Sequence, residues 1–355
     1  MNPLEKNIRK VTPYVPGEQP NKPGMLKLNT NENPYPPSAS VIKKLHSFDV
    51  SKLRLYPDSK AEVLVNALAK RYNVSPEQVF VGVGSDDVLA MSFLTFFNSK
   101  KPILFPDITY SFYDVWAEEF RIPFEKIPLN ASFHIRKEDY NRECGGVIFP
   151  NPNAPTGETE SLADIEDIVR QHQDVVVIVD EAYIDFGGES ALPLLERYEN
   201  LLIVQTFSKS RAMAGIRIGY AIGSPQLIRW LNDVKYSFNS YTMNPLTLAL
   251  GAAALEDEEY FQSIVHKIIA TRERMKEKFS ELGFVFGDSQ SNFLFVTHRR
   301  LPAKKMFEYL RAQDIYVRYF NQPRIDNYLR ITIGTDEEMD RLIAVLGEYI
   351  KNELS

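Results

Sequence analysis

The sequence has one cysteine, Cys144, among its 355 residues. A lone cysteine excludes a disulfide within the chain and is typical of proteins from reducing compartments. The sequence also lacks any apolar run of about 18 residues, so no membrane-spanning helix is expected. Its first residues lack the apolar stretch of a secretory signal. We therefore predict a cytoplasmic protein that has no membrane partner.

Positive charge is not in excess, and the histidines do not cluster. The chain has 41 Lys and Arg against 47 Asp and Glu, a net charge of −6, so it lacks the basic surface that nucleic-acid binding requires. Its five histidines show no spacing typical of metal ligands. They are His46, His134, His172, His266 and His298. We predict neither a nucleic-acid partner nor a metal site.

Short apolar runs alternate with helical patterns through the first two thirds of the chain. The runs are 79–83, 103–105, 147–149, 175–179, 201–205 and 218–222, and clear helical patterns cover 59–72 and 161–171. Ser75-Pro76-Glu77 is typical of a helix start. This alternation predicts an α/β fold, with a mainly parallel sheet flanked by helices.

The alternation of short apolar runs and helical patterns ends at about Pro245. Residues 247–282 predict a long helix that is broken near Asp257. Strands are expected at 292–297, 315–318 and 329–333, with a last helix over 336–351. These elements indicate a smaller α+β domain at the C-terminus.

Three parts of the chain are expected to have different roles. Residues 1–45 would form an N-terminal arm and part of the small domain, because their first 40 residues are rich in Pro and Asn and lack periodicity. Residues 46–245 would form the large domain. Residues 246–355 would form the small C-terminal domain.

The segment that begins at Thr206 places Lys209 and Arg217 eight residues apart, directly after an apolar strand pattern. A lysine amine can form a Schiff base with an aldehyde cofactor. Arg217, with the hydroxyls of Thr206 and Ser208, could hold a phosphate. A surface loop with basic residues would explain this stretch equally well.

A second segment ends in Asp180-Glu181-Ala182-Tyr183 and follows the β-branched run 175–179. Such a run is typical of a strand buried on both faces. Because ligands in open α/β sheets bind beyond the carboxyl ends of strands, Asp180 could pair with a protonated pyridine nitrogen there. Tyr183 could bond a ring hydroxyl. A solvated acidic pair at a strand end is the alternative.

Two turns complete the pattern. The turn 149–157, rich in Pro, Asn and Gly, follows another apolar strand and is expected to be rigid, although a purely structural loop has the same composition. Gly84, Ser85 and Asp86 lie between a strand pattern and a helical stretch. The free N–H groups of such a helix start could bind an anion. The glycine order does not match the dinucleotide-binding fingerprint.

In this order and spacing, the segments resemble the fold-type I aminotransferases of class I and II. The shared motifs are Pro-Asn-x-Pro-Thr-Gly, Asp-Glu-Ala-Tyr and Thr-Phe-Ser-Lys with a following Arg-x-Gly. Within this group the chain resembles the histidinol-phosphate aminotransferase family, from about residue 11 to about residue 350. The motifs of that resemblance are Val11–Gly17, Leu28–Pro34, Leu55–Asp58, Gly84–Asp86 and Leu329–Thr335.

The resemblance implies pyridoxal 5′-phosphate as the cofactor and assigns roles around its ring. Lys209 would carry the Schiff base and then move a proton between substrate and cofactor. Asp180 would keep the ring nitrogen protonated, and Tyr183 would bond the ring oxygen O3′. Tyr110 matches the aromatic residue that stacks on the ring, although a packed core tyrosine is an equally good explanation.

The resemblance also assigns the residues that would hold the cofactor phosphate. They are Arg217, the helix start at 84–86, and the hydroxyls of Thr206 and Ser208. In the family, the tyrosine matching Tyr56 reaches the phosphate of the neighbouring subunit. This implies a homodimer with shared active sites.

One position departs from the family pattern. Relatives usually have an asparagine directly before Pro-Thr-Gly, where it bonds O3′, but this chain has Ala154 there. Its asparagine lies one residue earlier, at Asn153. Either Asn153 substitutes, or Tyr183 holds O3′ with other help.

For the substrate, Arg330 matches the arginine that binds the substrate's anionic group, since a guanidinium fork suits a carboxylate or a phosphate. Arg318 and Tyr14 are secondary candidates for a substrate phosphate. A surface salt bridge is the alternative for Arg318.

The expected reaction is transfer of an amino group between glutamate and 2-oxoglutarate on one side and histidinol phosphate and imidazole-acetol phosphate on the other. Aromatic amino-acid aminotransferases and threonine-phosphate decarboxylases share much of the pattern and remain alternatives. A non-catalytic binding domain is a further alternative, but it would not need Lys209, Asp180 and Arg217 together.

Overall fold

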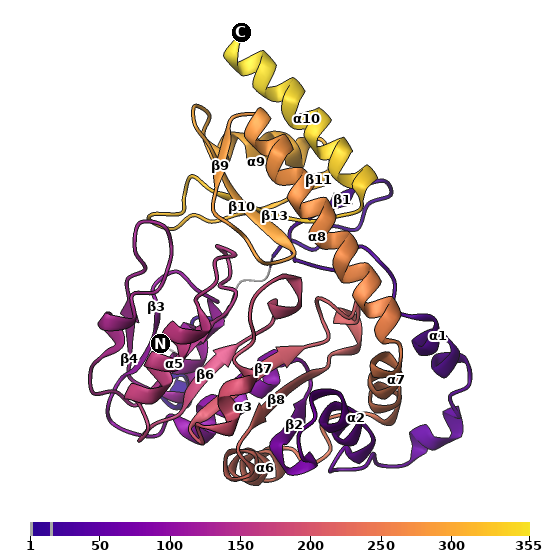
Figure 1. Ribbon diagram of the computed structural model, residues 1–355, viewed down its shortest axis with the longest axis vertical. Helices are drawn as coiled ribbons and strands as arrows, with labels where there is room; N and C mark the ends of the chain where they lie inside the picture. The colour runs from indigo at the N-terminus through magenta and orange to yellow at the C-terminus, as the bar shows by residue number, and fades with distance from the viewer. Residues whose placement is uncertain (1–2, 15–16) are drawn as a thin grey trace.

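The computed structural model describes residues 3–14 and 17–355. Its larger part contains a seven-stranded sheet of order β2-β8-β7-β6-β5-β3-β4, seen in the lower half of Figure 1. The strands are β2 (Val79–Gly82), β3 (Ile103–Pro106), β4 (Phe124–Ile127), β5 (Gly146–Pro150), β6 (Val177–Asp180), β7 (Leu201–Thr206) and β8 (Gly219–Gly223). Neighbours pair in parallel except at β8, which is antiparallel to both β7 and β2. The predicted mainly parallel sheet is confirmed.

Helices cover both faces of this sheet, which explains why its central strands are apolar without alternation. The helices are α2 (Glu62–Tyr72), α3 (Ser85–Phe96), α4 (Phe112–Phe120), α5 (Leu162–Gln171), α6 (Pro225–Phe238) and α7 (Pro245–Glu256). Side chains of α3, α4 and α6 pack on one face. Those of α2, α5 and α7 pack on the other. In α5, Ile165, Ile168 and Val169 are buried at helical spacing, and each stabilises the fold by about 1.5–3 kcal/mol.

The smaller part of the molecule is built around a four-stranded antiparallel sheet of order β12-β13-β10-β9. Its elements are α8 (Glu258–Glu281), β9 (Phe284–Phe286), β10 (Phe293–His298), α9 (Ala303–Ala312), β12 (Arg318–Tyr319), β13 (Leu329–Thr332) and α10 (Asp336–Leu354). The predicted break near Asp257 is confirmed: the Asp257 side chain caps α8 by accepting from the Tyr260 N–H. Helix α8 leads from the large sheet to the small one (Figure 1).

The N-terminal segment packs on both parts of the molecule. Tyr14 stacks on Phe112 at the start of α4, with ring centroids 4.1 Å apart. Farther along, β1 (Leu26–Lys27) pairs in parallel with β11 (Ile315–Tyr316) of the smaller part. The helix α1 (Ala39–His46) follows. Val15 and Pro16, which belong to the N-terminal motif, lie outside the described residues.

Two local predictions need correction. The helix start predicted at Ser75 leads only to a short 3-10 turn, Pro76–Gln78, because strand β2 begins at the next residue. Strand β4 was not predicted, since it is an edge strand whose Glu125 and Lys126 are exposed.

The domain boundaries at residues 45 and 245 remain a proposal, which limited proteolysis of the folded protein would test.

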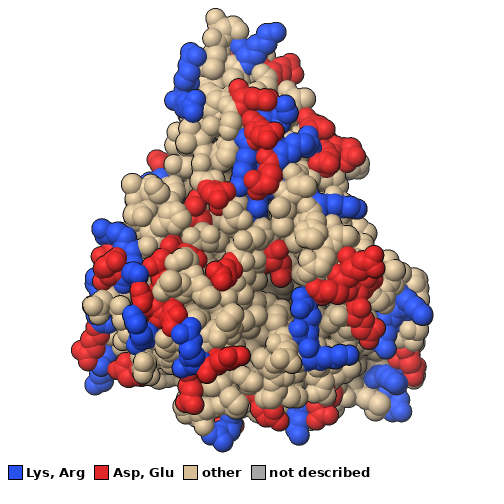
Figure 2. All heavy atoms as spheres, viewed as in Figure 1, with Lys and Arg blue, Asp and Glu red and all other residues tan. Residues whose placement is uncertain are grey.

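Within the described residues, no helix is both long and apolar enough to cross a membrane. Acidic and basic side chains are interspersed over the face shown in Figure 2, without a large area of either sign.

Candidate active site

A cavity of about 180 Å³ lies at the carboxyl ends of β5, β6 and β7, where Pro150, Asp180 and Thr206 end their strands. Ligand sites in open α/β sheets occupy this position. Nine of the predicted site residues line it: Ser85, Asp86, Tyr110, Asp180, Tyr183, Thr206, Ser208, Lys209 and Arg217. The remaining wall is formed by Thr30, Glu32, Pro150, Ala154, Ala182 and Ala214. Segments far apart in the sequence thus meet in one cavity.

Lys209 is held by the N-terminal segment. Its Nζ donates to the backbone oxygen of Thr30 at 3.1 Å. Its own backbone oxygen accepts from Nδ2 of Asn33 at 2.9 Å. The Nζ lies 5.8 Å from the ring centroid of Tyr183. Among the described residues no carboxylate forms an ion pair with this amine, although its charge acts on Glu32, which also lines the cavity.

Asp180 presents a desolvated carboxylate at the opposite end of the site. Its Oδ2 accepts from the hydroxyl of Tyr113 at 2.9 Å, and its Oδ1 accepts from the N–H of Ala182 at 3.2 Å. Burial raises the pKa of the Asp180 carboxyl to about 6, despite these two hydrogen bonds. A cationic partner would lower this pKa again and favour the ionised form, and a protonated pyridine nitrogen is such a partner.

The N-terminal end of α3 borders the cavity through Ser85 and Asp86. Helix α3 has no side-chain cap, so its first N–H groups are free to bind an anion. Arg217 faces this end, and its Nη2 lies 3.2 Å from Oδ2 of Asp86. A Cβ at Gly84 would come within 2.3 Å of that nitrogen, so a larger residue would displace the guanidinium, and the φ of 84° also favours glycine. Free N–H groups beside a guanidinium and the hydroxyls of Thr206 and Ser208 fit a phosphate.

Arg330 lies on β13, next to the Tyr183 side of the cavity. Its Cζ is 5.3 Å from the Phe293 ring, and that ring packs edge-on against Tyr183. One Nη donates to the Asn29 backbone oxygen at 3.1 Å, whereas the buried Nε has no partner among the described residues. Burial lowers the pKa of the guanidinium. Such a desolvated cation with free donors is suited to bind an anion.

The two secondary candidates lie near Arg330. The charge of Arg318 acts on Arg330, and so does the phenol of Tyr14. Arg318 has its guanidinium over the Phe320 ring, at 5.6 Å. Within the described part of the chain, no carboxylate lies within salt-bridge distance of it. The surface salt bridge considered for Arg318 is therefore not observed.

The family model for aminotransferase class I and II matches residues 23–346. The chain belongs to the class I and II aminotransferases. It is 52% identical over 349 residues to a histidinol-phosphate aminotransferase of Lactococcus lactis subsp. cremoris, covering 98% of each chain. It is 54% identical to histidinol-phosphate aminotransferase 1 of Hydrogenovibrio crunogenus, covering 98% of this chain and 97% of the relative.

Solved structures share the fold of this aminotransferase. One is the histidinol-phosphate aminotransferase of Sinorhizobium meliloti in complex with pyridoxal 5′-phosphate, with a TM-score of 0.86 at 23% identity. The superposition covers 99% of this chain and 98% of the Sinorhizobium meliloti chain. The enzyme from Clostridium acetobutylicum has a TM-score of 0.85 at 22% identity, covering 92% and 100%. The predicted fold-type I architecture is confirmed.

Six predicted residues are not among those that line the cavity of this aminotransferase: Gly84, Arg330, Arg318, Tyr14, Asn153 and Tyr56. The amide of Asn153 points away, donating to the Ile108 backbone oxygen and to the Thr156 hydroxyl, both at 3.0 Å. It does not substitute for the asparagine missing at Ala154, whose side chain lines the cavity. Of the two alternatives considered for the ring oxygen, this arrangement favours Tyr183, because both N–H groups of the Asn153 amide already have acceptors in Ile108 and Thr156. Tyr56 is 83% exposed and is not part of the cavity of its own chain.

The segment Leu28–Pro34 supplies contacts that sequence reasoning did not assign. Thr30 and Glu32 line the cavity, Asn33 holds the Lys209 loop, and Asn31 donates to the Tyr183 hydroxyl at 2.9 Å. The only sequence signal was the family motif in this segment. Tyr113, the partner of Asp180, was also missed, because an aromatic residue within a helix is more often core.

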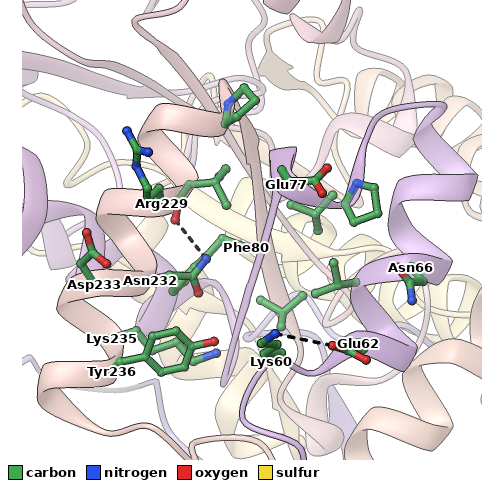
Figure 3. A pocket seen from close by; sticks show the side chains of 16 residues that line it. Lys60, Glu62, Asn66, Glu77, Phe80, Arg229, Asn232, Asp233, Lys235 and Tyr236 are labelled. Atoms are coloured by element: carbon green, nitrogen blue, oxygen red, sulfur yellow. Dashed lines mark hydrogen bonds and ion pairs between the residues drawn. The ribbon is translucent and has the colours of Figure 1, made fainter.

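A larger hollow of about 790 Å³ lies elsewhere, between α2 and α6 against strand β2 (Figure 3). Lys235, only 5% exposed, lies on its α6 side with its Nζ 5.5 Å from the Phe80 ring centroid. Burial lowers the pKa of this lysine. None of the predicted site residues lines this hollow, and acidic Glu62, Glu77 and Asp233 do. Size alone therefore does not identify the active site.

Proposed function

We propose that this aminotransferase transfers an amino group between glutamate and imidazole-acetol phosphate, giving 2-oxoglutarate and histidinol phosphate in histidine biosynthesis. Its cofactor is pyridoxal 5′-phosphate. One observation carries the proposal: Lys209 and Asp180 share a cavity with Arg217, which lies at the start of α3, and a second guanidinium, the partly buried Arg330, lies beside it. Relatives of that name at 52% and 54% identity support the substrate.

When bound, the cofactor supplies an aldehyde and a ring that accepts electrons from the substrate. Lys209 anchors the aldehyde end and then accepts and returns a proton at its Nζ. Asp180 keeps a proton on the ring nitrogen, and the start of α3 with Arg217 holds the phosphate. Arg330 orients the substrate's anionic group. Asp180, Thr206 and Ser208 are buried, and low exposure to water strengthens the interactions that they make.

We expect this enzyme to prefer a phosphorylated amine acceptor. Amino transfer from glutamate should be measured with imidazole-acetol phosphate, phenylpyruvate and 4-hydroxyphenylpyruvate. The first should have a kcat/KM at least about tenfold higher, since one charge-assisted contact is worth 1.5–3 kcal/mol. A better rate with phenylpyruvate would favour an aromatic aminotransferase. Release of CO₂ from threonine phosphate without amino transfer would favour the decarboxylase.

We also propose a homodimer in which Tyr56 completes the neighbouring site. Tyr56 packs only on Tyr241 of its own chain, with ring centroids 4.8 Å apart, and both rings are exposed. Further exposed apolar side chains lie near them in the sequence. They are Val50, Leu53, Leu55, Tyr236 and Phe238. The hydroxyl of Tyr236 donates to the Ser59 backbone oxygen at 3.5 Å, so the two segments touch. Exposed apolar side chains that gather in this way are typical of a protein interface.

Mixing two inactive variants tests the dimer. In a heterodimer of Lys209→Ala and Tyr56→Ala chains, one site would carry both changes and the other none, if Tyr56 serves its neighbour. We expect the mixture to regain activity, up to about half of the wild-type rate per heterodimer, because one of two symmetric sites is intact. Heterodimers without recovered activity, or a fully active monomer in sedimentation, would contradict the proposal.

We propose a cytoplasmic location. The single cysteine, Cys144, is buried, and no disulfide is possible within the chain. Cell fractionation that recovers the protein outside the cytoplasm would contradict it.

A further inference from the structure

The hydrogen bonds that reach Tyr183 have a defined direction. The N–H of Asn31 donates to Oγ1 of Thr332 at 3.0 Å, and that hydroxyl donates to Oδ1 of Asn31 at 3.1 Å. Because the Asn31 oxygen is occupied in this way, its Nδ2 is the atom that faces Tyr183, and it donates to Oη at 2.9 Å. The Tyr183 oxygen is therefore an acceptor here, and its own proton is left for another partner.

Asn31 is fixed in this role by its surroundings. It is almost fully buried, and its φ of 56° lies in the left-handed region, which asparagine adopts more readily than most residues. Its backbone oxygen accepts from Nδ2 of Asn292 at 3.0 Å. Its neighbours Thr30 and Glu32 line the cavity. The amide has no freedom to turn without breaking several of these contacts.

The cavity wall leaves few donors for a ring oxygen near Lys209. In pyridoxal phosphate, the ring hydroxyl is attached beside the carbon that carries the aldehyde, so it must lie on the lysine side of the site. Tyr183 lies on that side, whereas the methyl group of Ala154 cannot donate and Asn153 points away. Tyr183 is thus the donor that must be correctly oriented.

We infer that Asn31 is a positioning residue, which directs the hydroxyl proton of Tyr183 onto the ring oxygen of the cofactor. This rests on the proposed function. A hydrogen bond donated to that oxygen stabilises its negative charge and lowers the pH at which the bound cofactor loses its proton. The hydrogen bond that Tyr183 accepts from Asn31 orients the Tyr183 hydroxyl. It also strengthens the hydrogen bond that this hydroxyl donates to the cofactor, because hydrogen bonds in a chain polarise one another.

A mutant cycle on the cofactor-loaded protein tests the inference, with the pH midpoint of the cofactor's visible absorbance as the measurement. Tyr183→Phe should raise the midpoint by about one to two pH units. Asn31→Gly, which tolerates the positive φ, should raise it by a smaller amount. Asn31→Asp keeps the side-chain shape but replaces the donor with an acceptor. Tyr183 would then donate to the introduced carboxylate instead of to the cofactor, and the midpoint should rise more than in Asn31→Gly.

The same Asn31 changes are then made in the Tyr183→Phe protein. We expect Asn31→Gly to cause no further shift there, and Asn31→Asp to shift the midpoint less than in the wild type, by its charge alone. Equal shifts in both backgrounds would show that Asn31 acts without Tyr183 and overturn the inference. If neither Asn31 change moved the midpoint of the cofactor-loaded protein that keeps Tyr183, the inference would also be overturned. A wild type that binds no cofactor would overturn the proposed function as well.

Discussion

Lys209→Ala should lower amino transfer by a factor on the order of 10⁴ or more, while the protein still folds. Proton transfer by a positioned base contributes about 10²- to 10⁴-fold, and the covalent anchor for the cofactor is lost with the same side chain. The fold should persist because the Nζ makes a single hydrogen bond, to the Thr30 backbone oxygen. Circular dichroism and thermal unfolding measure the fold, and single-turnover transfer from glutamate measures the chemistry.

Borohydride reduction and peptide mapping locate the covalent bond. The reduced pyridoxyl group should be found on Lys209, because only this lysine lines the cavity that Arg217 also lines. Lys235 is the control, since it is the one lysine that is buried among the described residues, and burial lowers its pKa. Lys235→Met should keep both the activity and the label on Lys209. A label on Lys235, or activity retained by Lys209→Ala, would refute the assignment.

The fold could be predicted where one physical cause dominates. The run 175–179 is β-branched because β6 is buried on both faces, and β6 ends at Asp180 as expected. Helix α5 was predicted by apolar spacing, and the Ser161 side chain caps it. The pattern failed at Pro76, where the cap and the proline are present but only one turn forms before β2. A local start signal cannot tell how far a helix continues, since tertiary packing decides that.

The site could be predicted only as far as chain position determines side-chain direction. Residues at strand ends and at the start of α3 face the cavity as expected, because backbone geometry places them there. The direction of Asn153 depended on two acceptors, the Thr156 hydroxyl of its own turn and the backbone oxygen of Ile108, which lies 45 residues earlier in the chain. The contribution of Asn31 depended on Thr332, about 300 residues away in sequence. Spacing within one segment contains no information about such a contact.

Arg330 is the residue on which substrate binding should depend most strongly. Its guanidinium lies between the rings of Phe293 and Phe320, at 5.3 and 5.7 Å, and burial lowers its pKa. Among the described residues it has no carboxylate within 4 Å, and its only hydrogen bond is to the Asn29 backbone oxygen. A partly buried cation without an ionic partner is destabilising by itself. An incoming anion would compensate that cost and gain a two-pronged contact.

Arg330→Met should therefore lower kcat/KM by roughly 30- to several-thousand-fold in both half-reactions, because losing one charge-assisted contact in a water-poor site costs about 2–5 kcal/mol. Both halves should suffer, since the glutamate carboxylate and the anionic group of the acceptor would use the same fork. Methionine keeps the apolar stem between the two rings, so the thermal midpoint should not fall. Arg330→Lys should recover only part of the loss, because an ammonium keeps the charge without the planar fork.

Arg324→Ala is the surface control: Arg324 pairs with Asp107 at 2.7 Å outside the cavity, and its loss should leave kcat/KM unchanged. If Arg330→Met lowered only cofactor retention, with normal kcat/KM in the loaded protein, Arg330 would have a structural role and the substrate's anion would have to be bound elsewhere.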